Sequence, residues 1–469
     1  MADLRSDPGS FRDPLSRVFP ADDAVYRAFS EMGKSDLDAV WGKSFIAKSL
    51  KSGDLIESTL LAPSEAPQIE GNWAAVMRHP KLPFISYPYE WTFSMLKDAA
   101  LLQLKLTRAA LKDGVGVKDA TPYNVQFVGA RTQFIDAGSF EVRSSSDPWY
   151  GYKQFCELFL YPLMLQAYRG VQFQPMLRGS VNGIDPVTMR KLLGRRRRPF
   201  AEKGRLTHVA LHAMAQERFA STEVKVKNEA AKAGMNSAVL DATLKKLIKL
   251  VDGLDIHDKK STWSNYSDRA HYNEASLDEK DRFVRDAVAT TRRKQLWDIG
   301  CNDGRFSRIA SPHVDSVMAM DADPLVIDRL YLALRDDKSI SNITPLYVDM
   351  ADTGGGIGWR GQERPGLFNR GNPDFILYLA VIHHLAITYN IPLGSQLDLL
   401  ASLTPEMVIE FPHEDDQMVV RLLRNKRDGV FKDYNLAEFE RLLGERFDIT
   451  KKMLLAGGTR TIFHAKRRG

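Results

Sequence analysis

The chain has 469 residues, of which 44% are hydrophobic and 26% are charged, a composition typical of globular proteins that bury real cores. This length predicts two or three domains. Because 65 basic residues are interleaved with 59 acidic ones, the net charge of +6 does not favour a nucleic-acid-binding protein. With Cys156 and Cys301 as its two cysteines, the sequence excludes a disulfide framework and a multi-cysteine metal site.

No segment of the sequence reads as a membrane or secretion signal. The first ten residues, MADLRSDPGS, are polar and lack an apolar stretch. The most apolar run, FILYLAVIHHLAI, is shorter than a membrane span and carries two histidines. We therefore expect a cytoplasmic protein without a membrane span.

The first hundred residues alternate strand and helix patterns. Residues 16–29 predict two short strands around an aspartate-rich turn. Helical patterns follow over 30–52 and over 93–113, where apolar residues recur at helical spacing. Between them, residues 82–91 are aromatic, prone to β structure and broken by prolines, which predicts a strand that runs into a connector.

The stretch VKDATPYNVQFVGARTQFIDAG, residues 117–138, holds the main functional signal of this half of the chain. Asp119 and Asn124 lie on one predicted loop, and Asp136 follows the next strand. Side-chain oxygens of this kind are the ligands that Mg²⁺ prefers, and Mg²⁺ bridges them to phosphates. The pattern therefore indicates a phosphate-handling site.

This stretch resembles the catalytic core of protein-kinase-like and aminoglycoside-phosphotransferase-like domains. The resemblance implies that Asp119 orients or deprotonates an acceptor hydroxyl, and that Asn124 and Asp136 hold Mg²⁺ against the phosphates of ATP. The sequence departs from the family where Val117 and Lys118 replace the usual histidine before the loop, and a clear glycine-rich phosphate loop is missing. For the cation that pairs with the nucleotide, Arg27 is the first candidate and Lys48 the second.

Residues 149–260 show a mostly helical pattern. Five apolar residues at helical spacing predict one buried face: Leu240, Leu244, Leu247, Ile248 and Val251. The run Arg195–Arg198 is interpreted as a solvated loop, with contact to an anion as the alternative. We predict a kinase-like α+β domain over 1–200, a helical extension and linker over 201–275, and a third region over 276–469.

The last region alternates strands and helices. Residues 294–310 predict a strand, a turn with Gly300 and Gly304, and a helix whose start offers free N–H groups. The next strands end on Asp321 and on Asp349, and a fourth is predicted from Asp374 to His383 and His384. Polar residues at the carboxyl ends of parallel strands form a ligand crevice.

This series resembles the class I S-adenosylmethionine-dependent methyltransferases, whose fold is a doubly wound, seven-stranded, Rossmann-like α/β sheet. The resemblance implies that Asp298 and the turn with Gly300, Asn302 and Gly304 hold the methionine end of the cofactor. Asp321, with Ala322, would bind the ribose, and Asp349 with Met350 would border the adenine. Asn302 departs from the glycine usual in the family, but asparagine tolerates left-handed backbone angles. The rival, a dinucleotide-binding domain, requires G-x-G-x-x-G, which GCNDGRFS lacks.

Three residues are candidates for the base that removes a proton from the methyl acceptor. They are His384, His383 as its alternate, and Glu410 at the end of the following strand. For the histidines, a contact with substrate or cofactor and a purely structural role remain open. Residues 261–284 are either a surface helix or a lid that turns Tyr266, Tyr272 and Lys280 toward the cofactor.

The whole chain resembles bacterial two-part proteins with a kinase-like front and a methyltransferase back, some of which are similar to a rhizobial nodulation protein. This implies an S-adenosylmethionine-dependent methyltransferase that acts on an oxygen or nitrogen nucleophile of a small-molecule or glycan-type acceptor. Two alternatives stay open: a bifunctional kinase–methyltransferase, and a methyltransferase whose pseudokinase front binds a partner. The sequence does not identify the acceptor or the oligomeric state.

Overall fold

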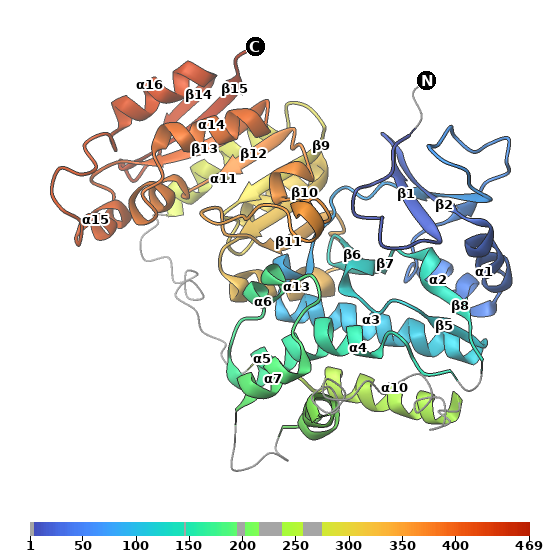
Figure 1. Ribbon diagram of the computed structural model, residues 1–469. Coiled ribbons are helices and arrows are strands. Elements are labelled where there is room, and N and C mark those ends of the chain that lie inside the picture. Colours follow the sequence, from blue (N-terminus) through green and yellow to red (C-terminus); the bar gives the residue numbers. More distant parts are fainter. Residues whose placement is uncertain (1–3, 145–146, 195–201, 215–236, 257–273) are drawn as a thin grey trace. The chain divides into compact units, whose positions relative to one another are not determined.

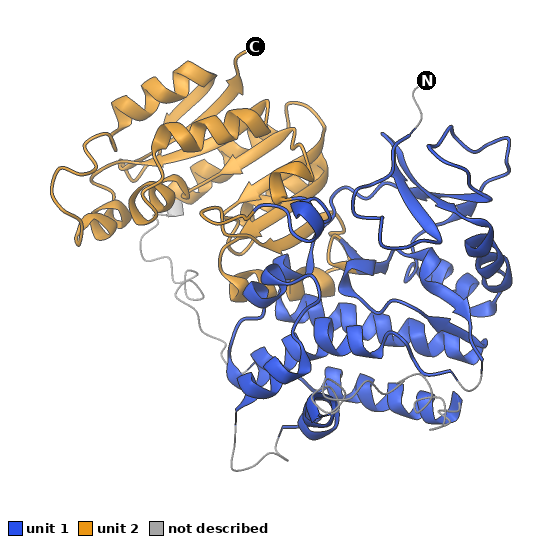
Figure 2. Cartoon of the chain, in the orientation of Figure 1, with its two compact units in different colours: residues 1–127, 132–258, 355–365 blue, residues 128–131, 259–354, 366–469 orange. Residues whose placement is uncertain are grey.

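The computed structural model describes residues 4–144, 147–194, 202–214, 237–256 and 274–469. The chain divides into two compact units (Figure 2). Unit 1 comprises residues 1–127, 132–258 and 355–365, and unit 2 comprises residues 128–131, 259–354 and 366–469. Within the described residues, no helix combines the length and the apolar character needed to cross a membrane.

Unit 1 begins with a four-stranded antiparallel sheet in the order β1-β2-β4-β3. Its strands are β1 (Ser16–Pro20), β2 (Ala24–Phe29), β3 (Thr59–Leu60) and β4 (Ala75–Pro80). The hairpin between β1 and β2 closes on a hydrogen bond from Ala21 N to Ala24 O (2.9 Å). The prediction of two strands around an aspartate-rich turn is confirmed.

Three helices follow the predicted pattern, with one interruption. They are α1 (Glu31–Trp41), α2 (Ser44–Ser52) and α3 (Phe93–Lys112). The side chains of Ser30 and Thr92 cap α1 and α3 by accepting backbone N–H groups. The helical stretch expected over 30–52 is two helices, because α1 ends at Trp41 with Gly42 as its C-cap and a new helix starts at Ser44.

The prediction of a strand over residues 82–91 is wrong. The strand lies earlier, at β4, and residues 88–90 form a short 3₁₀ turn. Pro80, Pro83 and Pro88 supply no backbone donors, so this segment cannot continue a sheet. Its aromatic side chains, including Tyr87 and Trp91, are buried in the core of unit 1.

The rest of unit 1 consists of two small strand pairs and a group of helices. The pairs are β5 (Val115–Val117) with β8 (Phe140–Val142), and β6 (Val125–Val128) with β7 (Arg131–Phe134), of which residues 128–131 at the turn belong to unit 2. The helices are α4 (Tyr152–Phe155), α5 (Tyr161–Arg169), α6 (Gln174–Gly179), α7 (Pro186–Leu193) and α10 (Ser237–Asp252). The apolar face of α10 is buried as predicted, except that Leu250 replaces Ile248. The run Arg195–Arg198 lies outside the described residues.

Unit 2 is built on a seven-stranded sheet in the order β11-β10-β9-β12-β13-β15-β14. The first five of these are parallel, and β15 runs antiparallel to both of its neighbours. Figure 1 shows helices on both faces of this sheet. The doubly wound, seven-stranded α/β fold expected from the sequence is present. The strands are β9 (Arg293–Ile299), β10 (Val314–Asp321), β11 (Ile343–Tyr347), β12 (Phe375–Tyr378), β13 (Glu406–Pro412), β14 (Phe447–Leu454) and β15 (Arg460–Arg467).

The helices of unit 2 begin with α11 (Glu274–Val288), which packs against α12 (Arg305–Ala310). The others are α13 (Pro324–Asp336), α14 (Leu393–Leu403), α15 (Gln417–Leu423) and α16 (Leu436–Arg446). The core between sheet and helices contains Phe283, Leu296, Ile327 and Phe375. Burial on both faces explains why the central strand β12 is a continuous apolar run, FILY, in the sequence.

Two of the predicted strand ends were placed too late in the sequence. Strand β11 ends at Tyr347, so Asp349 lies just beyond the strand. Strand β12 ends at Tyr378, and His384 begins a π-helical turn, His384–Thr388. An apolar run alone does not distinguish a buried strand from a buried helical turn.

Candidate functional site

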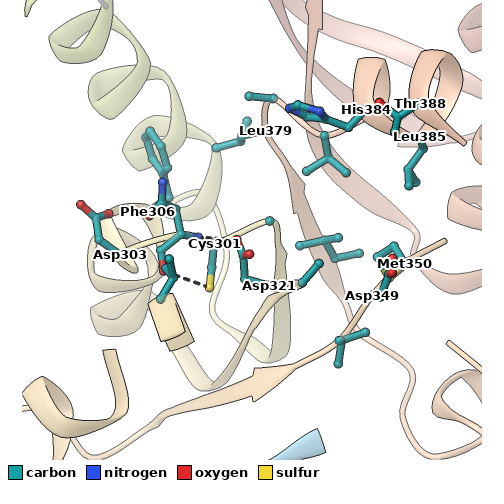
Figure 3. A pocket seen from close by; sticks show the side chains of 18 of the residues that line it. Cys301, Asp303, Phe306, Asp321, Asp349, Met350, Leu379, His384, Leu385 and Thr388 are labelled. Atoms are coloured by element: carbon teal, nitrogen blue, oxygen red, sulfur yellow. Dashed lines mark hydrogen bonds between the residues drawn. The ribbon is translucent and has the colours of Figure 1, made fainter. Parts of the chain in front are cut away.

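A cavity of about 470 Å³ opens at the carboxyl ends of β9, β10, β11 and β12 in unit 2 (Figure 3). This is the edge of a parallel sheet at which open α/β folds place their ligands. The volume lies within the range of about 300–1,000 Å³ typical of small-molecule sites.

The turn after β9 forms one wall of the cavity. Gly300 has a φ of +75°, and a Cβ atom there would stand 2.3 Å from Val381 Cγ2. Asn302 has a φ of +49°, in the left-handed region that asparagine tolerates better than most residues. Both residues line the cavity. Asn302 thus keeps the turn that a glycine usually makes.

Asp321, the last residue of β10, lies at the centre of the cavity (Figure 3). Its carboxylate accepts the backbone N–H groups of Asn302 (3.0 Å) and Asp323 (2.9 Å), which fix its orientation. Burial raises the pKa of Asp321 above the usual range of an aspartate, although these N–H groups oppose the shift. A carboxylate held in this way can accept hydrogen bonds from a pair of ligand hydroxyls.

Asp349 and Met350 lie side by side at another part of the cavity wall, just after β11 (Figure 3). Tyr389, which also lines the cavity, is close enough to Asp349 for the carboxylate charge to raise the pKa of its phenol. Ala322 completes this wall beside Asp321. Six of the predicted cofactor residues therefore line one cavity: Gly300, Asn302, Asp321, Ala322, Asp349 and Met350.

Two other predicted cofactor residues lie behind the wall. Asp298 is 1% exposed and accepts a hydrogen bond from Ser307 Oγ at 2.5 Å. Burial raises its pKa to about 7. Gly304 has a φ of +76° and packs against Leu330, whose Cδ1 would stand 2.7 Å from an added Cβ. In this structure both residues support the turn and do not line the cavity.

The two histidines are neighbours, but they differ in their access to the cavity. His384 lines the cavity, and burial lowers its pKa to about 4, so its ring is neutral at physiological pH. His383 lies behind it with ring centroids 4.1 Å apart, is 1% exposed and does not line the cavity. Of the two, only His384 is in a position to take a proton from a molecule in the cavity.

Glu410, the third candidate base, is fully buried and does not line the cavity. Its carboxylate pairs with Lys280 Nζ (2.5 Å) and with an Arg460 guanidinium nitrogen (3.4 Å). These two cations outweigh the effect of burial and lower the pKa of Glu410. A carboxylate with a lowered pKa and two cationic partners is a poor proton acceptor.

Several lining residues were not singled out from the sequence. Phe306 and Asp303 lie in or beside the first turn of α12, and Leu422 comes from α15. Ala380, with an unusual φ of +57°, follows β12. Lys280, considered as a lid residue, does line the cavity, whereas Tyr266 and Tyr272 lie outside the described residues. Side chains such as Leu422 reach the cavity through tertiary packing, which local patterns do not report.

The predicted phosphate-handling residues of unit 1 also lie close together. Asp136 accepts the hydroxyl of Ser139 (2.7 Å), and the side-chain amide of Asn124 donates to the same hydroxyl oxygen (3.2 Å). The Asn124 amide also donates to the backbone oxygen of Asp119 (3.4 Å), and Gln154 donates to the Asp119 carboxylate (3.3 Å). Burial, followed by the charge of Asp136, raises the pKa of Asp119.

In this structure the Asp136 carboxylate and the Asn124 amide nitrogen are held by neighbouring protein groups. Arg27, from β2, pairs with the Asp136 carboxylate at 3.0 Å, and the same oxygen accepts the Gly138 N–H at 3.0 Å. The Asn124 amide presents its nitrogen to Ser139. Among the residues that the structure describes, no three histidine, cysteine or acidic side chains are grouped so as to hold a metal ion. Lys48, the second candidate cation, lies exposed on α2.

Comparison with known proteins identifies the family. Nodulation protein NoeA from Rhizobium meliloti (strain 1021) is 33% identical over 465 residues, which cover 98% of this chain and 95% of that protein. The chain belongs to the NoeA family. The match to NoeA runs through both units, since it spans nearly the full length of each chain.

No protein-family model matches the chain. The matching solved structures include the N-methyltransferase NodS from Bradyrhizobium japonicum WM9 in complex with S-adenosyl-L-homocysteine, at 12% identity and a TM-score of 0.31, covering 44% of this chain and 98% of NodS. They also include magnesium protoporphyrin IX methyltransferase from Synechocystis PCC 6803 with bound S-adenosylhomocysteine, at 16% identity and a TM-score of 0.32, covering 44% of this chain and 95% of that one.

Proposed function

We propose that unit 2 is an S-adenosylmethionine-dependent methyltransferase of the cytoplasm, acting on an oxygen or nitrogen nucleophile of a small-molecule or glycan-type acceptor. One observation carries this proposal. Asp321 ends the strand next to β9 and faces the cavity, held by the N–H of left-handed Asn302. The glycine turn, the carboxylate proposed to bind the ribose and the cavity thus lie at the carboxyl edge of one sheet.

The residues at this edge fit the donor. Asp321 can accept both ribose hydroxyls, and Asp349 with Met350 can border the adenine. The apolar remainder of the wall, including Val326 and Leu379, suits the flat faces of a base. Bound there, the donor would supply a methyl group on a positively charged sulfur.

The chain's contribution is alignment and removal of water. A cavity that fixes nucleophile, methyl carbon and sulfur in one line turns an encounter of two molecules into an intramolecular step. His384, neutral and at the wall, would accept the proton that an O–H or N–H nucleophile releases. Glu410 is the weaker candidate for this role, because its carboxylate pairs with Lys280 and Arg460.

The acceptor class rests on the family. The relative is named a nodulation protein, and we propose that the acceptor of this chain is a small or glycan-type molecule of such a bacterial process.

Calorimetric titration with S-adenosylhomocysteine tests the donor site. Asp321→Asn keeps the shape of the side chain but removes its charge, so we expect affinity to fall by about 10- to 100-fold, the loss of one or two charge-assisted hydrogen bonds. Asp315→Asn is a matched control, because Asp315 lies on the same strand but is 55% exposed and pairs with Arg292 at the surface. Equal affinities of the wild-type and Asp321→Asn proteins would contradict the assignment.

We infer a second candidate function for unit 1, namely that of a kinase-like module. The observation that favours it is that Asp119, Asn124 and Asp136 are linked by hydrogen bonds, the last two through Ser139. Arg27 of β2 also pairs with Asp136. The resemblance implies ATP and Mg²⁺ as ligands. The Arg27–Asp136 pair occupies the carboxylate that would hold the metal, which favours a pseudokinase that binds a partner over a phosphotransferase.

Equilibrium binding of ATP with and without Mg²⁺ separates these alternatives. A phosphotransferase would bind ATP in a metal-dependent manner, turn it over, and lose turnover in the Asp119→Ala variant. A pseudokinase would show no turnover, and Asp119→Ala would change nothing. The absence of any nucleotide binding up to millimolar concentration would remove the phosphate site altogether.

A further inference from the structure

The charged residues that line the cavity are unevenly distributed. Three are carboxylates: Asp303, Asp321 and Asp349. Lys280 is the one lysine or arginine among the described residues that line it. A ligand with an anionic group therefore has a single cation in this wall with which to pair.

Lys280 is built into the core. It lies on α11, is 3% exposed, and its ammonium donates to Glu410 Oε2 at 2.5 Å. The two residues are 130 positions apart in the chain, so the pair joins α11 to β13. Burying an ammonium group costs free energy, and a paired carboxylate at hydrogen-bond distance offsets part of that cost.

The pair is part of a larger balanced network. Arg460 lies 3.4 Å from Glu410 Oε1 and makes two bonds to Asp416, at 2.7 and 3.0 Å. Asp416 is also the N-cap of α15, where it accepts the N–H of Met418. Two cations and two carboxylates thus hold one another in place. Lys280 is the member of this network that lines the cavity.

The position of Lys280 matches one end of the donor. Figure 3 shows Phe306 and Asp303 at one end of the cavity, Asp349 and Met350 at the other, and Asp321 between them. Lys280 Nζ lies 4.9 Å from the centre of the Phe306 ring. A nucleoside with its base beside Asp349 and its ribose at Asp321 therefore extends its remaining part toward Lys280.

We propose that Lys280 binds the carboxylate of the donor's amino-acid portion, and that Glu410 is a positioning residue that holds the Lys280 ammonium at the cavity wall. The inference rests on the proposed function, because it presumes that the cavity takes S-adenosylmethionine. It gives Glu410 a role in binding in place of the role of a base.

The test compares two ligands that differ by the carboxylate alone. They are S-adenosylhomocysteine and its decarboxylated analogue, which keeps the nucleoside, the thioether and the amine. The wild-type full chain is expected to bind S-adenosylhomocysteine about 10- to 100-fold more tightly, since hydrogen bonds between charged groups are the stronger kind. Equal affinities for the two ligands would overturn the proposal without any variant.

Single-residue variants then test whether Lys280 causes the preference for the ligand that carries the carboxylate. In Lys280→Met the ratio of the two affinities is expected to fall to near unity while the analogue binds as before, which also shows that the cavity is folded. Lys280→Arg should restore part of the ratio, and Glu410→Gln should lower it. A ratio that stays at the wild-type value in Lys280→Met would overturn the proposal.

A matched control lies on the same strand. Glu406 of β13, which is 15% exposed, pairs with the buried Arg293 at 2.7 Å, and neither residue lines the cavity. Glu406→Gln should leave the ratio unchanged, and an equal fall in Glu406→Gln and Glu410→Gln would overturn the positioning role. Wild-type protein that binds neither ligand would instead refute the proposed function itself, and the inference with it.

Discussion

At residue scale, the left-handed Asn302 connects backbone geometry to the site. It has a φ of +49° in the turn after β9, and in this turn its N–H donates to the Asp321 carboxylate at 3.0 Å. A residue other than glycine in this conformation costs about 1–2 kcal/mol, less for asparagine. The sequence predicted this tolerance, and the structure shows why it is needed.

We therefore expect opposite results from two substitutions of Asn302. Asn302→Gly should keep the turn and the affinity for S-adenosylhomocysteine, whereas Asn302→Val should lower the free energy of unfolding by about 1–2 kcal/mol and weaken binding. Thermal unfolding and calorimetry measure the two quantities. If the glycine variant lost as much affinity as the valine variant, the asparagine side chain and not the backbone angle would be what matters.

The role of His384 is tested by the rate of methyl transfer. His384→Ala should lower the maximal rate by about 10²- to 10⁴-fold, the usual contribution of a general base, with little change in donor affinity. His313→Ala is a control outside the cavity. A matched loss of donor affinity in His384→Ala would show that the ring shapes the cavity and does not act as the base.

The same histidine gives unit 2 a pH dependence. Burial holds the pKa of His384 at about 4, below the ordinary value of 6.5. Unfolding restores the higher value, so the unfolded chain binds the proton more tightly. The corresponding stability is present above pH 6.5 and is lost as the pH falls from 6.5 toward 4. We expect the melting temperature of wild type to fall more over this window than that of His384→Asn; parallel curves would contradict this.

At the scale of elements, the helix after β10 begins on a capping aspartate. Asp323 accepts the N–H groups of Leu325 (3.0 Å) and Val326 (3.4 Å), and Val326 lines the cavity. Asp323→Ala should lower the free energy of unfolding by about 0.5–2 kcal/mol. Asp336→Ala, in the last turn of the same helix, removes a carboxylate from the unfavourable end of the helix dipole and should be neutral or slightly stabilising. Denaturant unfolding that shows equal losses would refute the capping role.

Some elements of unit 2 could be predicted from the sequence and others could not. Strands of unit 2 were predictable where they are short apolar runs, as in FILY of β12, or where a glycine turn follows them, as Gly300 follows β9. The turn with His384 was misplaced, because apolar residues continue from β12 into the helical turn. The pair of Lys280 and Glu410 was not predictable, since its members lie 130 residues apart and meet through tertiary packing. The sequence therefore offered Glu410 as one of three candidate bases and gave no sign of its pairing with Lys280.

At the scale of the whole molecule, the chain passes between its units more than once. Residues 355–365 belong to unit 1, where Glu363 pairs with Arg12 at 2.6 Å and Arg364 lies 4.6 Å from the Tyr123 ring. Residues 128–131 belong to unit 2, where Gly129 N donates to Thr344 Oγ1 at 3.0 Å. The boundaries predicted at residues 200 and 275 do not include these two crossings between units. Residues 128–131 and 355–365 are short segments inside longer sequence patterns, so the sequence does not mark them as boundaries.

The two candidate sites nevertheless use separate residues. Asp136→Asn weakens the pair with Arg27 in unit 1 and touches no residue of the cavity in unit 2. We expect its affinity for S-adenosylhomocysteine, measured by calorimetry, to equal that of wild type. Loss of that affinity in a variant that remains folded would show that the two sites depend on each other.

A crystal structure of the full chain grown with S-adenosylhomocysteine would show whether unit 2 binds the donor as proposed. We expect the ligand in the cavity of unit 2, with its adenine beside Asp349, its ribose hydroxyls on Asp321 and its carboxylate on Lys280. Density for the ligand outside this cavity, or with its ribose away from Asp321, would contradict the account.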